Sequence, residues 1–117
     1  MSSISLMLPI KTISESNYRE HWAVKARRAK KQRTSACLLA QSIVPLLPKT
    51  GHMEITLTRI GARKLDSDNL AGSQKHVQDG VADALKIDDG SSRLTWIYKQ
   101  EKGKAGEYAV RLTIKIV

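Results

Sequence analysis

Residues 53–89 read MEITLTRIGARKLDSDNLAGSQKHVQDGVADALKIDD, and this stretch decides the fold because its apolar side chains change from strand spacing to helix spacing. Residues 53–58 alternate apolar and polar side chains, which predicts a β-strand. A single helix is predicted to follow, with Ser67 or Asp68 as its cap. Its apolar positions share one face: Leu70, Val77, Val81 and Leu85. The sequence Asp88-Asp89-Gly90 has the composition of a turn, so the stretch predicts a strand, one helix and a turn.

Upstream of this stretch, the spacing predicts another strand and a long helix. Residues 3–10 alternate until Pro9 interrupts them, which is strand periodicity. A helix is expected to begin at Ser16 or Asn17, either of which can cap it, and to end near Ile43. Its expected buried stripe consists mostly of small side chains: Trp22, Ala26, Ala29, Ala36, Ala40 and Ile43. Such a stripe predicts close packing against a neighbouring element.

Downstream, two strands are predicted with a loop between them. Residues 94–99 alternate, residues 102–106 have the composition of a hairpin loop, and residues 108–116 form the clearest strand pattern. The order of elements is therefore β-α-β-α-β-β. Two helices cannot cover both faces of a small four-stranded sheet. We therefore predict an α+β fold in which residues 1–117 form a single domain, with a four-stranded mixed sheet and two helices packed on one face.

The charges of the chain are divided between an acidic segment and a basic remainder. All six aspartates lie in residues 66–89, which carry a charge of −4, against +13 for the rest of a chain whose net charge is +9. Crowded carboxylates repel one another, and a hard divalent cation such as Mg²⁺ is a natural compensator. A cationic surface attracts a polyanion. The division favours a metal-dependent enzyme that acts on nucleic acid; the alternative is a basic protein whose charge serves only solubility or a ribosomal-type structural role.

The chain lacks the signals of several other protein classes. Its single cysteine, Cys37, permits neither an internal disulfide nor a thiolate zinc site, and its three histidines are scattered without ligand spacing. No apolar run approaches the ~20 residues of a transmembrane helix. The N-terminus does not resemble a signal peptide. We therefore expect a cytoplasmic protein with no membrane partner.

Each acidic position also has an interpretation that needs no metal ion. An aspartate in the cap position contributes about 1 kcal/mol to helix stability. Asp79 and Asp83 fall on a solvated helix face, which we favour over metal ligation, and Asp79 can pair with Lys75 four residues earlier. An unbroken helix through this segment would be about 25 Å long, so Asp66 and Asp89 can meet only if the chain folds back or the helix is shorter or kinked. Taken together, these interpretations do not explain why aspartate is absent elsewhere.

Basic residues are concentrated in the first predicted helix and directly before the aspartates. Those in the helix surround its axis and could neutralise phosphates, although a solvated helix face explains them equally well: Arg27, Arg28, Lys30, Lys31 and Arg33. Arg63 and Lys64 immediately precede Asp66 and could hold a phosphate beside a bound metal ion. Trp96 and Tyr98 share a strand face and are expected in the core or at an interface, and Trp22 is expected in the core.

The segment Arg63-Lys64-Leu65-Asp66-Ser67-Asp68-Asn69-Leu70, together with Asp83-Ala84-Leu85-Lys86-Ile87-Asp88-Asp89, resembles the RusA family of Holliday-junction resolvases of bacteria, phages and prophages. The family pattern has basic residues, then Asp-x-Asp-Asn-Leu, a helix that ends in Asp-Ala-Leu, and a paired Asp-Asp. The match covers residues 63–90, and the order of strands is compatible with the whole chain.

The resemblance implies one RusA-like endonuclease domain that acts as a homodimer and cuts four-way DNA junctions with Mg²⁺, or with Mn²⁺ as a substitute. It implies that Asp66, Asp68 and Asp89 are the essential catalytic carboxylates and metal ligands. Asp88 would be a lesser ligand. The DNA arms would be gripped by the basic residues named above, from the first helix and the segment before the aspartates.

This chain departs from the family pattern at one position. The family has an essential lysine one helical turn after its second aspartate, and this chain has Gly72 there. Lys75 lies about one turn later on the same face, so the catalytic role of the family lysine has either moved to Lys75 or been lost. Two alternatives to a junction resolvase stay open: a non-catalytic protein that binds branched DNA, and a nuclease that acts on other branched DNA.

Overall fold

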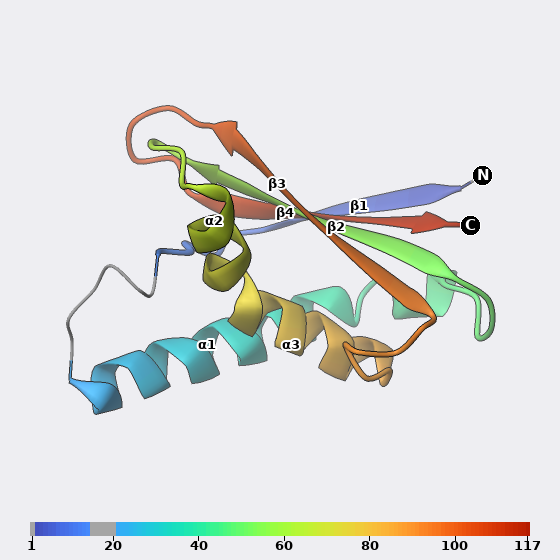
Figure 1. Cartoon of the computed structure of the whole chain (residues 1–117). Helices are drawn as coiled ribbons and strands as arrows, with labels where there is room; N and C mark the ends of the chain where they lie inside the picture. The colour runs from blue at the N-terminus through green and yellow to red at the C-terminus, as the bar shows by residue number, and fades with distance from the viewer. Residues whose placement is uncertain (1, 15–20) are drawn as a thin grey trace.

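The structure is a computed structural model and describes residues 2–14 and 21–117. Its elements follow in the order β1 (Ser3–Leu8), α1 (Trp22–Ala40), the 3-10 helix η2 (Val44–Leu46), β2 (Met53–Gly61), α2 (Ser67–Ser73), α3 (Lys75–Leu85), β3 (Leu94–Lys102) and β4 (Ala109–Ile116). The four strands form one sheet in the order β1-β4-β2-β3, and α1 and α3 cover one of its faces (Figure 1). The predicted α+β class, with a four-stranded mixed sheet and helices on one face, is confirmed.

At the centre of the sheet, β2 pairs in parallel with β3 and antiparallel with β4, and β4 also pairs antiparallel with β1. The chain leaves β2, crosses the helix-covered face through α2 and α3, and returns as β3, as parallel neighbours require. The predicted hairpin at residues 102–106 is therefore wrong, because β2 lies between β3 and β4. Alternating apolar residues indicate a strand, but they do not indicate which strand lies beside it.

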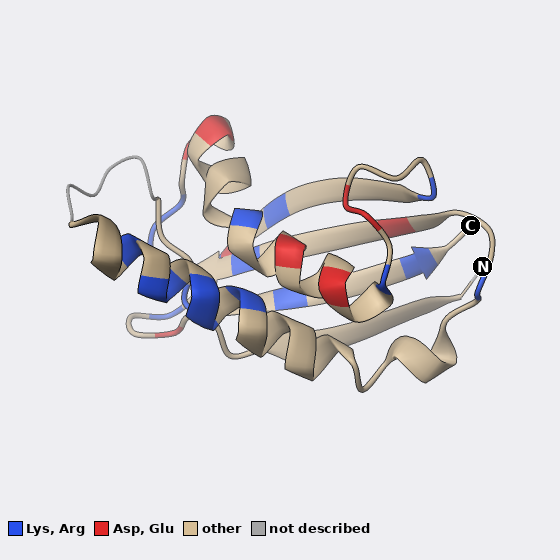
Figure 2. Cartoon of the chain, turned by 90° about the horizontal axis from the view of Figure 1, so that it is seen from below, with Lys and Arg blue, Asp and Glu red and all other residues tan. Residues whose placement is uncertain are grey.

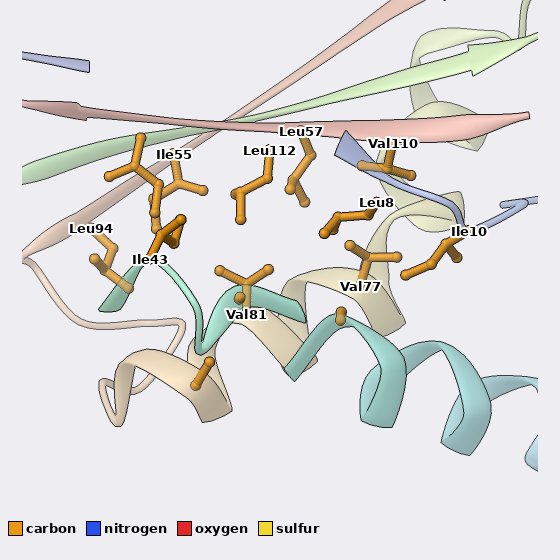
Figure 3. Packing of buried hydrophobic residues seen from close by; sticks show 14 of the residues in the cluster. Leu8, Ile10, Ile43, Ile55, Leu57, Val77, Val81, Leu94, Val110 and Leu112 are labelled. Atoms are coloured by element: carbon orange, nitrogen blue, oxygen red, sulfur yellow. The ribbon is translucent and has the colours of Figure 1, made fainter. Parts of the chain in front are cut away.

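The core lies between the helix-facing side of the sheet and the helices α1 and α3 (Figure 3). Every second strand residue points into it, and the apolar face of α3 meets these side chains. Its fully buried members include Leu57, Leu112, Val77 and Val81. Burying one such side chain contributes roughly 1.5–3 kcal/mol. This layer fixes α3 against the sheet, and with it the acidic segments at both ends of that helix.

The start of α1 differs from the prediction. The helix begins at Trp22 after the N-cap His21, whose Nδ1 accepts a backbone hydrogen bond at 3.2 Å. The predicted caps Ser16 and Asn17 lie outside the described residues. Trp22 is 75% exposed, so its predicted place in the core is wrong. The tryptophan fits the helical spacing, but it precedes the part of α1 that lies against the rest of the protein.

The second half of α1 packs closely against α3, as its small side chains predict. A Cβ atom added to Gly80 would lie 2.3 Å from the Arg33 carbonyl oxygen and 2.8 Å from the Ala36 Cβ atom. The two helix backbones can therefore approach this closely only because residue 80 has no side chain. The helix ends at Ala40 and does not continue to Ile43.

The second predicted helix is two helices, α2 and α3, which meet at Gln74. This residue has φ −95° and ψ −3°, and its N–H is directed at the carbonyl oxygens of residues 71 and 72. A departure from helical dihedrals of this kind bends or ends a helix. The Gln74 side chain is fully buried at this junction. Gly72 is exposed and has no atom within 4 Å of its missing Cβ, so no other backbone lies close to it within the described residues.

Candidate functional site

Two side chains on the helix-facing side of β3 hold the acidic segments of the protein in place. Trp96 Nε1 donates a hydrogen bond to the Asp89 carbonyl oxygen at 2.9 Å. Four residues later on the same side of the strand, Gln100 bonds both the N–H and the carbonyl oxygen of Leu65, each at 2.8 Å. Between them, Tyr98 contacts α3 through its hydroxyl group. One strand therefore positions both the segment that leads into α2 and the turn that follows α3.

The turn that follows α3 brings Asp89 back beside the start of that helix. Lys86 has a left-handed backbone conformation, with φ 57° and ψ 37°, which ends the helix and redirects the chain. Asp88 Oδ1 then accepts a hydrogen bond from the Gly90 N–H at 2.9 Å, which confirms the predicted turn. Asp89 consequently lies within ion-pair distance of Lys75, in the first turn of α3. The chain thus folds back at this end of the acidic segment.

Lys75 lies between two carboxylates. Its Nζ is 2.9 Å from Asp79 Oδ1, as predicted for this pair, and 3.4 Å from Asp89 Oδ2. Gln78 Nε2 donates to the same oxygen of Asp89 at 3.4 Å, and Gln78 Oε1 accepts a hydrogen bond from the Tyr98 hydroxyl group. The Asp89 carboxylate is therefore tied to α3 directly and to β3 through Gln78.

These contacts keep Lys75 positively charged and Asp89 ionised at neutral pH. The hydrogen bond to Asp79 is the largest cause that raises the pKa of Lys75, and the contact with Asp89 raises it further. Partial burial raises the pKa of the Asp89 carboxyl group, but hydrogen bonds with Asp88, Lys75 and Gln78 and the charge of Lys75 outweigh burial and hold that pKa below its ordinary value. The site thus combines a fixed cation with fixed anions at neutral pH.

Asp66 and Asp68 lie on the exposed first turn of α2. Asp66 is the N-cap residue and makes no side-chain cap hydrogen bond, so the prediction that Ser67 or Asp68 caps the helix is wrong. Since α2 has seven residues, it is about 10 Å long, and it separates these carboxylates from Lys75. Figure 2 shows the acidic tip of α2 apart from the acidic residues of α3 and of the loop that follows it.

The carboxylates have the chemistry that Mg²⁺ prefers, since it takes oxygen ligands, but they are divided between two places. Within residues 2–14 and 21–117, no three His, Cys, Asp or Glu side chains form a group that could hold a metal ion. The structure brings Asp89 and Asp79 together around Lys75, and it leaves Asp66 and Asp68 on α2. The arrangement does not assemble the three implied ligands, so their assignment stays a prediction.

A surface pocket of about 420 Å³ lies beside this network, between α1 and the end of α3. Two basic residues, Arg33 and Lys86, line it. Arg33 Nε and Nη2 donate to the Asp83 carboxylate at 2.6 and 2.9 Å. This bidentate pair raises the pKa of Arg33 and lowers that of Asp83. The carboxylates of Asp79, Asp88 and Asp89 also line the pocket. Arg33, predicted to contact DNA, and Asp83, predicted on a solvated helix face, are thus partners across two helices.

Basic side chains line two further pockets, which share Lys11. The first, of about 540 Å³, is lined from α1 and the segment before it by Lys11, Arg28 and Lys31 among others. The second, of about 470 Å³, lies where β2 ends and is lined by Lys11, Arg59, Arg63 and Lys64 among others. The remaining predicted DNA-binding residues, Arg27 and Lys30, are exposed on α1, along which Figure 2 shows a series of basic positions. A basic track therefore runs from α1 to the segment before Asp66.

Sequence reasoning missed three residues of this region: Gln100, Arg59 and Lys11. Two of them could have been found from the sequence. Each lies at an inward-facing position of a strand, where the alternation predicts an apolar side chain and the sequence has a polar one. Arg59 follows Ile55 and Leu57 on β2, and Gln100 follows the aromatic pair on β3. Lys11 lies in a polar stretch after β1 and carries no such signal.

Comparison with known proteins gives one similarity and no family. No family model matches the chain. The chain is 29% identical over 118 residues to a protein of Xylella fastidiosa named "Uncharacterized protein", and the aligned part spans 97% of this chain and 76% of that protein. Because that name states no activity, the similarity does not assign a function to the site.

No helix within residues 2–14 and 21–117 is both long enough and apolar enough to cross a membrane.

Proposed function

We propose that the protein is a Mg²⁺-dependent, structure-specific endodeoxyribonuclease that resolves four-way DNA junctions in recombination and repair, with Mn²⁺ as a substitute metal. It would act as a homodimer in the cytoplasm of a bacterial or phage-infected cell. The observation that supports this most is the arrangement along β3, where Gln100 holds the segment before Asp66 and Trp96 holds Asp89. These anchors are about 13 Å apart at 3.3 Å per residue, so both acidic halves of the RusA-like pattern lie along one side of one strand.

The charges around the acidic segments are consistent with this activity. Lys75 is held between Asp79 and Asp89, and a positioned cation of this kind can stabilise negative charge on an attacked phosphate. Arg63 and Lys64 precede the α2 carboxylates and would neutralise phosphates of the DNA arms, together with the basic residues of α1. A two-fold dimer would present two such sites to a two-fold symmetric junction.

The test is a cleavage assay on the full chain. The purified protein is incubated with a labelled four-way junction, a flap substrate and a matched linear duplex, each in Mg²⁺, in Mn²⁺ and in EDTA. We expect symmetric cuts in the junction alone, and only with a divalent metal. Light scattering of the same preparation measures the mass and tests the homodimer. Cuts in the flap with an intact junction would identify a nuclease for other branched DNA.

Two substitutions assign the residues. Asp68→Asn should abolish cutting and retain junction binding, and Lys75→Met should lower the cleavage rate by roughly 10²–10³-fold, as the loss of a charge-stabilising group does. Glu54→Gln is the matched control, because alternation along β2 directs this carboxylate away from the helices; it should cut at the rate of the unsubstituted protein. Cleavage that persists in Asp68→Asn would refute the assignment.

A second candidate function is a protein that binds branched DNA without cutting it. The division of the carboxylates between α2 and the turn after α3 favours it, because no group of three was found in the described segments. In that case the ion pairs of Lys75 would serve only to hold the turn against α3. Junction binding without cleavage, in Mg²⁺ and in Mn²⁺, would support this function and contradict the first.

A further inference from the structure

The pocket at the end of β2 contains a buried arginine, Arg59. Arg59 is only 6% exposed, although it lies on a strand of a small protein. Its Nη1 donates to the Arg63 carbonyl oxygen at 2.7 Å, and its Nε to the Thr12 carbonyl oxygen at 3.4 Å. No ion pair with Asp or Glu is formed by this guanidinium within the described parts of the chain. Buried charges are normally paired, so among the described residues this guanidinium lacks a counter-charge.

The surroundings of Arg59 are also basic. Its pocket holds about 470 Å³ and is lined by Lys11, Arg63 and Lys64 and by the polar side chains of Ser14 and Tyr108. Among the described residues, no carboxylate lines this pocket. The Lys11 ammonium group lies 4.3 Å from the centre of the Tyr108 ring, a cation–π contact that directs it toward this region. Burial lowers the pKa of Arg59, because an environment with little water disfavours the charged form of the guanidinium.

The backbone leaves space for the guanidinium group. A Cβ atom added to Gly61 would lie 2.8 Å from Arg59 Nη1 and 2.9 Å from its Cζ and Nη2. Since Gly61 has an ordinary φ, turn geometry does not require the glycine here. Two of the five N–H groups of Arg59 bond backbone carbonyl oxygens, and a planar fork of the remaining donors matches two oxygens of a phosphate.

We propose that this pocket, with Arg59 at its base and Lys11, Arg63 and Lys64 at its rim, binds a phosphate group, and that the phosphate is one of the DNA backbone. The inference rests on the proposed function for the source of the phosphate. The pocket adjoins the segment that leads through Leu65 into α2, so a strand seated there would pass beside Asp66 and Asp68. Arg59 would therefore set the position of the strand relative to these carboxylates.

The experiment uses two probes on the full chain. Inorganic phosphate is titrated into ¹⁵N-labelled protein while the arginine side-chain N–H signals and the amide signals of Ala62 and Leu65 are followed. A fluorescein-labelled four-way junction is titrated separately by anisotropy at several salt concentrations. The variants are Arg59→Gln and Gly61→Ala, the latter of which keeps every charge. Lys49→Gln is the control, because it removes an exposed charge just before β2, at the opposite end of that strand.

We expect phosphate to shift the Arg59 and Leu65 signals in the unsubstituted protein and in Lys49→Gln, and not in the two pocket variants. Junction affinity should fall about tenfold in Arg59→Gln, as for loss of a charged hydrogen bond, and the salt slope should fall by about 0.9, as for one lost phosphate contact. If circular dichroism shows that Arg59→Gln does not fold, Gly61→Ala and Lys11→Gln carry the test.

The outcomes separate this inference from the proposed function. Unchanged phosphate shifts in folded pocket variants would overturn the inference, even if the protein cuts junctions. A different result would be that the unsubstituted protein binds phosphate, that the pocket variants do not, and that the protein does not bind the junction. This result would uphold the site with free phosphate as its ligand and would contradict the proposed function.

Discussion

The contact between α1 and α3 predicts opposite effects for the same substitution at two glycines. Alanine at residue 80 would place its Cβ 2.3 Å from the Arg33 carbonyl oxygen and 2.8 Å from the Ala36 Cβ atom. Ordinary C···O contacts begin near 3.3 Å, so the helices would have to separate by about 1 Å. Overpacking of this kind costs about 1–3 kcal/mol, and the better helix propensity of alanine offsets roughly 1 kcal/mol of it. We expect Gly80→Ala to lower the free energy of unfolding by up to about 2 kcal/mol.

Gly72→Ala is the matched control. This residue is also helical, but it is exposed and has no atom within 4 Å of its missing Cβ, so only the gain in helix propensity remains. We expect it to raise the free energy of unfolding by up to about 1 kcal/mol. Urea denaturation followed by far-ultraviolet circular dichroism measures both. With a slope of about 1–3 kcal/mol per molar urea, the two midpoints should move in opposite directions. A Gly80→Ala protein as stable as Gly72→Ala would refute the close approach of the two helices.

Three further predictions concern stability. The hydrogen bonds with its arginine partner lower the pKa of Asp83, so this ion pair stabilises the folded protein above the unfolded pKa of about 4, and the stabilisation is lost as the pH falls through the folded pKa. Asp83→Asn should therefore lower the free energy of unfolding at pH 7 and much less in strong acid. An equal effect at both pH values would contradict the pairing. Gln100→Ala removes two hydrogen bonds to Leu65 and should lower the free energy of unfolding by about 1–3 kcal/mol. Hydrogen exchange of the Leu65 amide should become faster. Unchanged exchange would argue against this anchor. Leu112→Ala should cost about 2–5 kcal/mol in thermal unfolding, whereas Leu38→Ala, at a 64% exposed position, should change stability by less than about 0.5 kcal/mol.

The strands were predictable because each buries one side, and burial leaves a period of two in the sequence. Residues 53–58 and 108–116 carry that period, and both are strands in the structure. The class of the fold follows from the order of these elements. The neighbour of β3 was not predictable, because alternation is the same whether a strand pairs with the preceding or the following one. The break at Gln74 was missed for a similar reason, since Leu70 and Val77 keep helical spacing across it.

The candidate site was predictable in composition and not in arrangement. The concentration of aspartates and the pairing of Lys75 with Asp79 are local properties, since residues four apart on a helix are neighbours. The contact between Lys75 and Asp89 depends on the left-handed residue that ends α3, and nothing in the local pattern marks Lys86 for that conformation. The polar residues at inward-facing positions of β2 and β3 could be recognised in the sequence as exceptions to the alternation. Their partners could not be predicted, because they come from other parts of the chain.

By itself, the sequence determined which segments form strands, which faces are apolar, and that all aspartates fall in one short segment of a basic chain. Those properties arise from neighbouring residues and from the periods of helix and strand. Only the tertiary structure decided that β2 separates β3 from β4, that Asp89 returns to Lys75, and that Arg59 is buried. Each of these depends on how the elements pack around the shared core, and packing joins residues that lie far apart in the sequence.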